Sequence, residues 1–166
     1  LLWEQWISGN YWEEHSISKK QRPEQPAKLK ARLMRLDSPT PPPGIRCCTV
    51  RDALQGLPDP RDKSYVISNH EFRDGAKPYP GHTGSLLDAP SKALKAGDHG
   101  VPGGENMIAF GDGTYRYYTV RESARIQTFP DDYIFSGSWT EAMRQLGNAV
   151  PVRLAKAVGD SIVNQV

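Results

Sequence analysis

The sequence has few cysteines and no long apolar run. Its two cysteines, Cys47 and Cys48, are adjacent, which gives neither a usual disulfide pair nor the spacing of metal ligands. We interpret them as small, partly buried thiols. No apolar run reaches the roughly 20 residues that a membrane helix needs, and no signal peptide is recognisable. These features predict a soluble, cytoplasmic protein with no membrane partner and no metal site.

The excess of positive charge is also small. The 166 residues carry a formal net charge of +2, which is only a weak indication of a polyanionic partner. Glycine and proline are frequent, with 15 and 14 residues, and therefore predict many loops. A chain of this length can bury a core of moderate size.

The first 46 residues divide into an aromatic segment and a basic one. Residues 1–18 contain all but one of the tryptophans, and apolar side chains four residues apart predict a short amphipathic helix. Residues 19–46 are rich in lysine and arginine, with a basic helix expected over residues 27–36 and an extended polyproline stretch over residues 39–43. This segment either follows DNA phosphates or is a solvated linker, and the sequence leaves both interpretations open.

The middle of the chain is rich in glycine and predicts short strands between loops. Strand-forming residues bounded by turn signals indicate strands at residues 65–69, 91–96, 106–110 and 115–120. A turn at Asp112 and Gly113 is expected before the last of these strands.

Four helices are predicted outside the first 46 residues. Thr49, Thr119 and Ser138 each stand three residues before an acid, which is the pattern of a helix-capping box. The third of these helices is expected to end at Gly147 in the left-handed conformation, and a fourth helix starts near Pro151.

The fourth predicted helix carries an apolar stripe. Leu154, Val158 and Ile162 recur every four residues, so they lie on one side of the helix. Such a stripe needs a surface to cover, and no partner for it is evident in the sequence. We therefore expect a larger domain to cover it.

Two segments near the C-terminus carry the most specific pattern. Residues 118–131 read YTVRESARIQTFPD, and residues 144–151 read RQLGNAVP. Together they resemble the ninth and tenth conserved motifs of bacterial DNA (cytosine-5) methyltransferases, at the separation found in that family. The resemblance is tight over residues 118–166 and looser over the glycine-rich region before them.

Other parts of the family pattern are not recognisable. The chain has no Pro-Cys dipeptide, which holds the nucleophile of these enzymes, and no glycine-rich cofactor loop or Gln-x-Arg-x-Arg block. Residues 105–107, Glu-Asn-Met, stand in the glycine-rich region, so we do not interpret them as the catalytic Glu-Asn-Val motif. Because a cysteine thiolate must first add to cytosine carbon 6, the resemblance implies no catalytic residue in this chain and no activity without the N-terminal half.

The resemblance implies that the glycine-rich region is the target-recognition domain. Base readout in the major groove needs donors and acceptors at fixed places. The candidates for DNA contact are Arg73, Lys77, His82, Thr83, Ser85, Lys92, Lys95, Asp98 and His99.

The resemblance also implies roles for the two motifs. Arg121, Glu122 and Arg125 would form a polar core that organises the recognition domain; the alternative is an ordinary surface helix, on which the two arginines repel each other. The cofactor-binding candidates are Asn148, Ala149 and Val150, which would contact S-adenosylmethionine; the alternative is a plain helix stop.

The predicted fold class is α+β: a small, loop-rich target-recognition domain with short strands, followed by C-terminal helices that would dock on a missing Rossmann-like α/β catalytic domain. The expected segments are 1–46 (helix and basic linker), 47–137 (recognition domain) and 138–166 (return to the catalytic domain). The expected partners are double-stranded DNA and the N-terminal catalytic half, in a bacterial, nucleoid-associated restriction–modification setting. The alternative is a stand-alone, sequence-selective DNA-binding module without catalysis.

Overall fold

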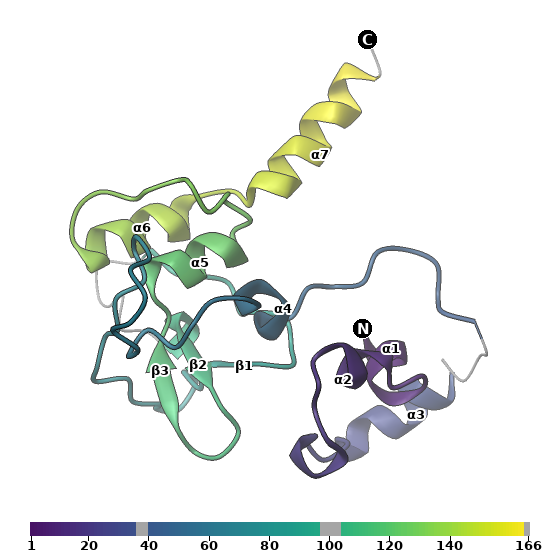
Figure 1. Cartoon of the computed structure of the whole chain (residues 1–166). Coiled ribbons are helices and arrows are strands. Elements are labelled where there is room, and N and C mark those ends of the chain that lie inside the picture. Colours follow the sequence, from purple (N-terminus) through teal and green to yellow (C-terminus); the bar gives the residue numbers. More distant parts are fainter. Residues whose placement is uncertain (36–39, 97–103, 165–166) are drawn as a thin grey trace. The chain divides into compact units, whose positions relative to one another are not determined.

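The computed structural model describes residues 1–35, 40–96 and 104–164. These residues form two compact units, Leu1–Cys48 and Thr49–Val166 (Figure 1). The positions of the two units relative to one another are not determined, so each unit is described by itself.

The first unit consists of short helices around an aromatic core. The α-helices are α1 (Leu2–Trp6), α2 (Asn10–Glu14) and α3 (Lys30–Met34), with 3-10 turns η1 (Lys19–Gln21) and η2 (Ala27–Leu29). The short helix expected within residues 1–18 is confirmed as α1, and a second helix, α2, follows it after Gly9, which has a left-handed φ of 80°. The basic helix expected over residues 27–36 is confirmed as η2 followed by α3.

Tyr11 and Trp12 are the centre of the first unit, each with 1% of its surface exposed. The Trp12 indole N–H donates to the Gln5 carbonyl oxygen, which connects α2 to α1. Arg46 stacks on the Tyr11 ring at 5.3 Å and forms an ion pair with Glu4 at 3.1 Å. The end of the basic segment is therefore held against the aromatic core by charge as well as by packing.

The second unit contains a three-stranded sheet of order β1-β2-β3. The strands are β1 (Ser85–Leu86), β2 (Met107–Ala109) and β3 (Tyr115–Tyr117). Strand β1 runs parallel to β2, and β3 runs antiparallel to β2 with Ile108 opposite Arg116. The strands expected near residues 106–110 and 115–120 are confirmed in a shorter form.

The strands expected at residues 65–69 and 91–96 are wrong, because both segments are loops. Val66 is fully exposed at 100%, so the first segment lacks the half-buried surface on which strands form. In the second segment, the Lys92 N–H donates to Ser85 Oγ at 3.0 Å and the Lys95 N–H to Asn106 Oδ1 at 3.4 Å. Side chains thus use backbone groups that a strand ladder would require.

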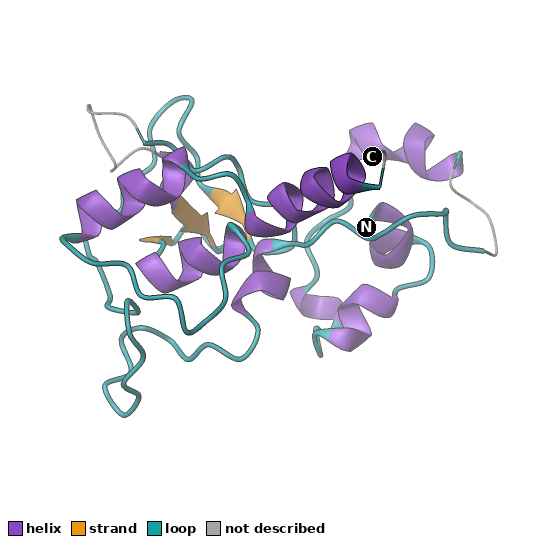
Figure 2. Ribbon diagram, turned by 90° about the horizontal axis from the view of Figure 1, so that it is seen from above, coloured by secondary structure: helices purple, strands orange, loops and turns teal. Residues whose placement is uncertain are grey.

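Among its described residues, the second unit also contains four α-helices and one 3-10 turn. They are α4 (Val50–Leu54), α5 (Val120–Ile126), α6 (Trp139–Asn148) and α7 (Val152–Val163), with the 3-10 turn η3 (Gly104–Asn106) before β2. The predicted caps are confirmed, since the Thr49, Thr119 and Ser138 side chains each accept a backbone N–H of the first helical turn. Most of the chain between the helices is loop (Figure 2).

The core of the second unit lies where α4, α5 and α6 meet the sheet. Helix α5 contacts both α4 and α6. The buried apolar side chains are Val50, Leu94, Ile108, Tyr118, Val120, Ala124, Phe135, Ala142, Met143 and Leu146. This unit therefore mixes a small sheet with helices, in agreement with the α+β class.

Two further expectations are wrong. Gly147 is not a left-handed helix end: it lies inside α6, which continues to Asn148, and it is not among the glycines with positive φ. A glycine is required here for another reason: the backbone of Lys95 and Ala96 approaches so closely that it leaves no room for a side chain. Cys47 and Cys48 are both exposed rather than partly buried.

Helix α7 has no buried residue and extends away from α5 and α6 (Figure 1). Its start is fixed by the Val152 N–H, which donates to the Gln127 carbonyl oxygen at 3.0 Å. The stripe residues Leu154, Val158 and Ile162 are 54%, 52% and 60% exposed. Among the described residues, no helix is long and apolar enough to cross a membrane.

Candidate functional site

A buried ion pair connects α5 to the sheet. The Arg116 guanidinium on β3 donates two hydrogen bonds to the Glu122 carboxylate, both at 2.7 Å. Only 10% of the Arg116 side chain and 2% of the Glu122 side chain are exposed. Glu122 also accepts the Thr119 N–H at 2.8 Å, so one carboxylate completes the capping box and fixes the strand.

Arg121 holds two loops against α5. Its guanidinium donates to the carbonyl oxygens of Ser68 at 3.2 Å, Pro130 at 3.3 Å and Tyr133 at 2.9 Å. The residue is 1% exposed. A buried cation bonded to three carbonyl oxygens fixes the loop that contains Ser68 and the loop that contains Pro130 and Tyr133.

Arg125 lies one helical turn further and is partly exposed. It binds the Asp131 carboxylate at 2.8 and 2.6 Å and the Gln55 carbonyl oxygen at 2.7 Å. The Arg125 guanidinium holds the pKa of Asp131 below its ordinary value. Arg121 and Arg125 therefore have separate partners. Arg121 binds backbone carbonyl oxygens, and Arg125 binds mainly the Asp131 carboxylate.

Gln127 connects the end of α5 to the turn between α6 and α7. Its side-chain amide donates to the Leu146 carbonyl oxygen at 2.8 Å and to the Ala149 carbonyl oxygen at 3.4 Å. It is 9% exposed. Sequence reasoning missed Gln127, because its partners are backbone carbonyl oxygens of a distant segment, which no residue pattern displays.

The three residues expected to contact the cofactor stand together at this turn. Asn148 ends α6, Ala149 is its C-cap and Val150 follows. Asn148 and Val150 are exposed, and Ala149 is half-buried. The turn thus presents a side-chain amide and a short apolar surface. Gln127 fixes the backbone of the turn through its bonds to the Leu146 and Ala149 carbonyl oxygens.

Three of the predicted DNA contacts, Thr83, Ser85 and Lys92, line one cavity of about 520 Å³. Gly84, Gly111, Gly113 and Tyr115 are among the other residues of its wall. The Lys92 ammonium donates to Thr83 Oγ1 at 2.8 Å, and Ser85 is 2% exposed with its hydroxyl bonded to the Lys92 backbone. The cavity therefore holds a lysine whose two ends are both positioned by the segment that contains β1.

Two other candidates, His82 and Lys95, gather around Glu105. Their distances to its carboxylate are 2.9 Å from His82 Nδ1 and 3.2 Å from Lys95 Nζ. Tyr79 stacks on the His82 ring at 4.2 Å. Burial alone would raise the pKa of Glu105, but the hydrogen bonds from Lys95 and His82 outweigh it, so the pKa is lowered.

The remaining candidates do not join these groups. The Arg73 guanidinium lies over the Trp139 ring at 4.7 Å, and Lys77 is exposed in a loop. Asp98 and His99 lie outside the described residues.

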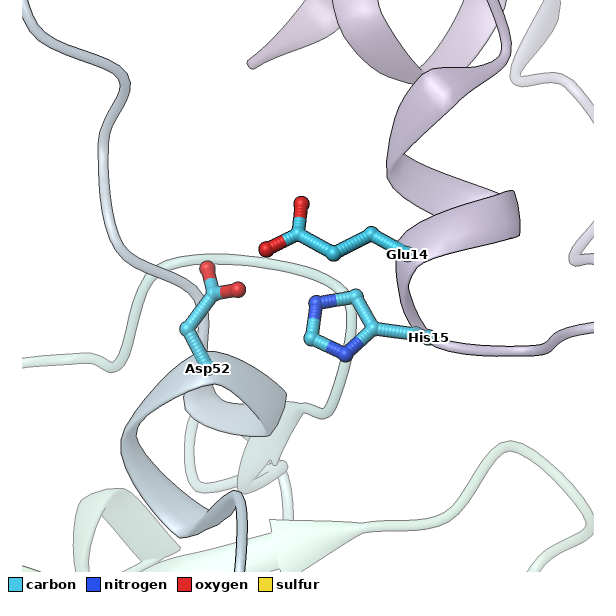
Figure 3. A group of neighbouring side chains, drawn as sticks. All are labelled: Glu14, His15 and Asp52. Carbon is cyan, nitrogen blue, oxygen red and sulfur yellow. The ribbon is translucent and has the colours of Figure 1, made fainter.

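Figure 3 draws Glu14, His15 and Asp52, three side chains whose chemistry would suit a metal ion. Glu14 and His15 belong to the first unit and Asp52 to the second. Because the two units are not placed relative to one another, these residues do not define a site. Within its own unit, the Asp52 carboxylate caps α4 by accepting the Thr49 N–H at 2.7 Å.

Residues 5–164 match the family described as C-5 cytosine-specific DNA methylase. The chain therefore belongs to this family of DNA methyltransferases.

Similar proteins are type II methyltransferases of bacteria. M.Eco47II of Escherichia coli is 57% identical over 49 residues, which are 30% of this chain and 12% of that enzyme. M.Sau96I of Staphylococcus aureus is 55% identical over 49 residues, 30% of this chain and 11% of that enzyme. M.SacI of Streptomyces achromogenes is 33% identical over 146 residues, 70% of this chain and 37% of that enzyme. These matches all span well under half of the relative's length.

Proposed function

We propose that this chain is the DNA-recognition and cofactor-pocket-completing portion of a DNA (cytosine-5) methyltransferase. The complete enzyme methylates carbon 5 of cytosine in a short duplex site and uses S-adenosylmethionine. By itself the portion is inactive. The observation that carries this proposal is that α5 has buried polar contacts at both ends: Glu122 binds Arg116 on the sheet, and Gln127 binds the α6–α7 turn.

Helix α5 therefore connects the two regions of the proposed function. The candidate DNA-binding cavity with Lys92 lies beside the sheet, and the cofactor candidates Asn148, Ala149 and Val150 lie at the α6–α7 turn. We assign residues 47–137 to the target-recognition domain and residues 138–166 to the return into the catalytic domain. Residues 1–46 are the helical and basic segment before them.

The cavity beside β1 suits DNA. Lys92 is held by Thr83 at its ammonium and by Ser85 at its backbone, so little conformational freedom is lost when it binds. Glycines in the wall let a backbone approach closely. A positioned ammonium can bind a phosphate or the O6 and N7 atoms of guanine. His82 and Lys95, held by Glu105, would extend this surface.

The α6–α7 turn suits the amino-acid end of S-adenosylmethionine. The exposed Asn148 amide offers both a donor and an acceptor, as an ammonium and a carboxylate require. Val150 gives an exposed apolar surface beside it, and the bond from Gln127 fixes the Ala149 carbonyl oxygen. When bound, S-adenosylmethionine supplies the methyl group.

Methyl transfer is expected only when this chain is combined with an N-terminal half that carries the Pro-Cys and Glu-Asn-Val motifs. The assay measures label from S-adenosylmethionine in DNA of mixed sequence, for each part alone and for the mixture. Label that depends on both parts supports the proposal, and mapping the methylated site gives the specificity. An inactive mixture, together with salt-dependent DNA binding by this chain alone, would instead establish a stand-alone binding module.

Lys92→Ala should weaken DNA binding about tenfold, or about 1.4 kcal/mol. If the contact is to a phosphate, the slope of log K against log salt should also decrease in magnitude by about one. Fluorescence anisotropy with labelled duplex DNA over a range of salt concentrations measures both quantities. Thr83→Val, which frees the Lys92 ammonium, should have a smaller effect in the same direction. Lys156→Ala on α7 removes one equal charge from a side chain that is 73% exposed and is the matched control. Equal losses from Lys92→Ala and Lys156→Ala would refute a specific contact.

A further inference from the structure

Residues 91–96 cross helix α6 at Gly147 in direct backbone contact. A Cβ atom built on Gly147 would lie 2.6 Å from Ala96 N, 2.7 Å from Lys95 C and 2.9 Å from Ala96 Cα. These are backbone atoms, so they cannot move aside as the end of a flexible side chain does. Any side chain at position 147 must therefore displace the crossing segment or α6.

The same segment is also fixed by hydrogen bonds to Asn106. The side-chain amide of Asn106 accepts the Lys95 N–H and donates to the Lys95 carbonyl oxygen, both at 3.4 Å. Asn106 is 0% exposed, and Leu94 next to this contact is buried in the core. The segment is thus held between Asn106 and Gly147 without being a strand, and little displacement is possible without loss of these bonds.

Backbone conformation does not explain a glycine at position 147. Gly147 lies inside α6 and is not among the glycines with positive φ. In such a helical position, glycine costs about 0.5–1 kcal/mol relative to alanine. Gly159 in α7 provides the contrast, because an added Cβ there meets no described atom within 4 Å. The close crossing is the feature that requires glycine at position 147.

We propose that Gly147 is a positioning residue, which sets where the crossing segment presents the ammonium groups of Lys92 and Lys95 to DNA. The proposal rests on the proposed function, because that function makes these lysines DNA contacts. Gly147 stands directly before Asn148, so one turn of α6 seats the DNA-contacting segment and also carries the cofactor candidates.

The test compares Gly147→Ala with Gly159→Ala in the full chain. In Gly147→Ala, amide exchange measured by NMR at Lys92 and Lys95 should become at least tenfold faster, because their N–H bonds to Ser85 and Asn106 are lost. DNA binding should weaken at least tenfold. The slope of log K against log salt, which is negative, should decrease in magnitude by about one to two. Gly159→Ala should change none of these quantities.

The salt slope separates positioning from simple destabilisation. A variant that only unfolds more easily has fewer binding-competent molecules, but its folded molecules keep the same number of phosphate contacts and the same slope. An unchanged slope in Gly147→Ala would therefore overturn the role in DNA contact. Unchanged exchange at Lys92 and Lys95 would overturn the seating itself.

If the unmodified chain does not bind DNA, the proposed function fails, and the exchange measurement alone decides whether Gly147 seats the segment. If Gly147→Ala does not fold, Asn106→Ala releases the segment by removing the two side-chain hydrogen bonds to Lys95. That variant should reproduce the fall in salt slope, and a wild-type slope would contradict the proposal.

Discussion

Arg121→Met is expected to lower the free energy of unfolding of the second unit by about 3–5 kcal/mol. Methionine fills much of the buried volume, but it donates no hydrogen bond to the carbonyl oxygens of Ser68, Pro130 and Tyr133. A hydrogen bond to a charged group contributes about 1.5–3 kcal/mol, and the buried Arg121 guanidinium donates all three of these bonds. Since a domain is stable by only about 5–15 kcal/mol, this one change removes a large part of the stability.

Urea unfolding followed by fluorine NMR of 5-fluorotryptophan measures this effect in the whole chain. Trp139 belongs to the second unit, and the other three tryptophans lie in the first, so the resonance of Trp139 follows the second unit alone. Arg144→Met on α6 is the control, because Arg144 is 50% exposed and its ion pair with Glu141 is of the surface type. The control should cost no more than about 1 kcal/mol. Equal losses in the two variants would show that the carbonyl contacts of Arg121 do not stabilise the loops.

The helix starts could be predicted from the sequence because their causes are local. A capping box needs only a hydroxyl residue and an acid three positions later, and Thr49 and Thr119 both form it. The strand expected at residues 91–96 was wrong for the opposite reason. Its backbone is bonded by the side chains of Ser85 and Asn106, which lie several residues away and leave no local pattern.

The arrangement around α5 shows the same limit. The sequence identifies Arg121, Glu122 and Arg125 as a group, but it gives two arginines of like charge on one helix with no visible partner for Arg121. The partners of Arg121 are backbone carbonyl oxygens on two loops, which no residue pattern displays. Arg116, the partner of Glu122, lies on a strand that pairs with β2, so its position depends on the sheet.

The role of Gly147 has no local cause in the sequence. A glycine at the end of a predicted helix is commonly the left-handed residue that stops it, and Gly147 stands in that position of the sequence. Its actual environment is set by the crossing of residues 91–96, about fifty residues earlier in the chain. A contact between segments so far apart becomes visible only in the folded unit.

The largest functional effect is expected on α7, and it follows from the proposed function. Leu154, Val158 and Ile162 form an apolar stripe with more than half of each residue exposed. A helix of 12 residues is marginal in water unless its apolar side is packed. Full burial of such a side chain is worth about 1.5–3 kcal/mol, so three of them provide a substantial part of an interface. We infer that the N-terminal catalytic portion of the enzyme covers this stripe.

Val158→Asp should therefore reduce methyl transfer by the combined parts at least about a hundredfold, because it puts a charge into an apolar contact. DNA binding and urea unfolding of the isolated chain should stay unchanged, since Val158 is 52% exposed there. Val163→Asp makes the identical substitution on the opposite side of α7, at a residue that is 74% exposed, and should retain most of the activity. Titration of either variant with the N-terminal portion separates weaker association, which excess partner restores, from a defect in catalysis. Equal loss in both variants would mean that α7 does not dock through this stripe, because only a side-specific effect follows from burial of Leu154, Val158 and Ile162.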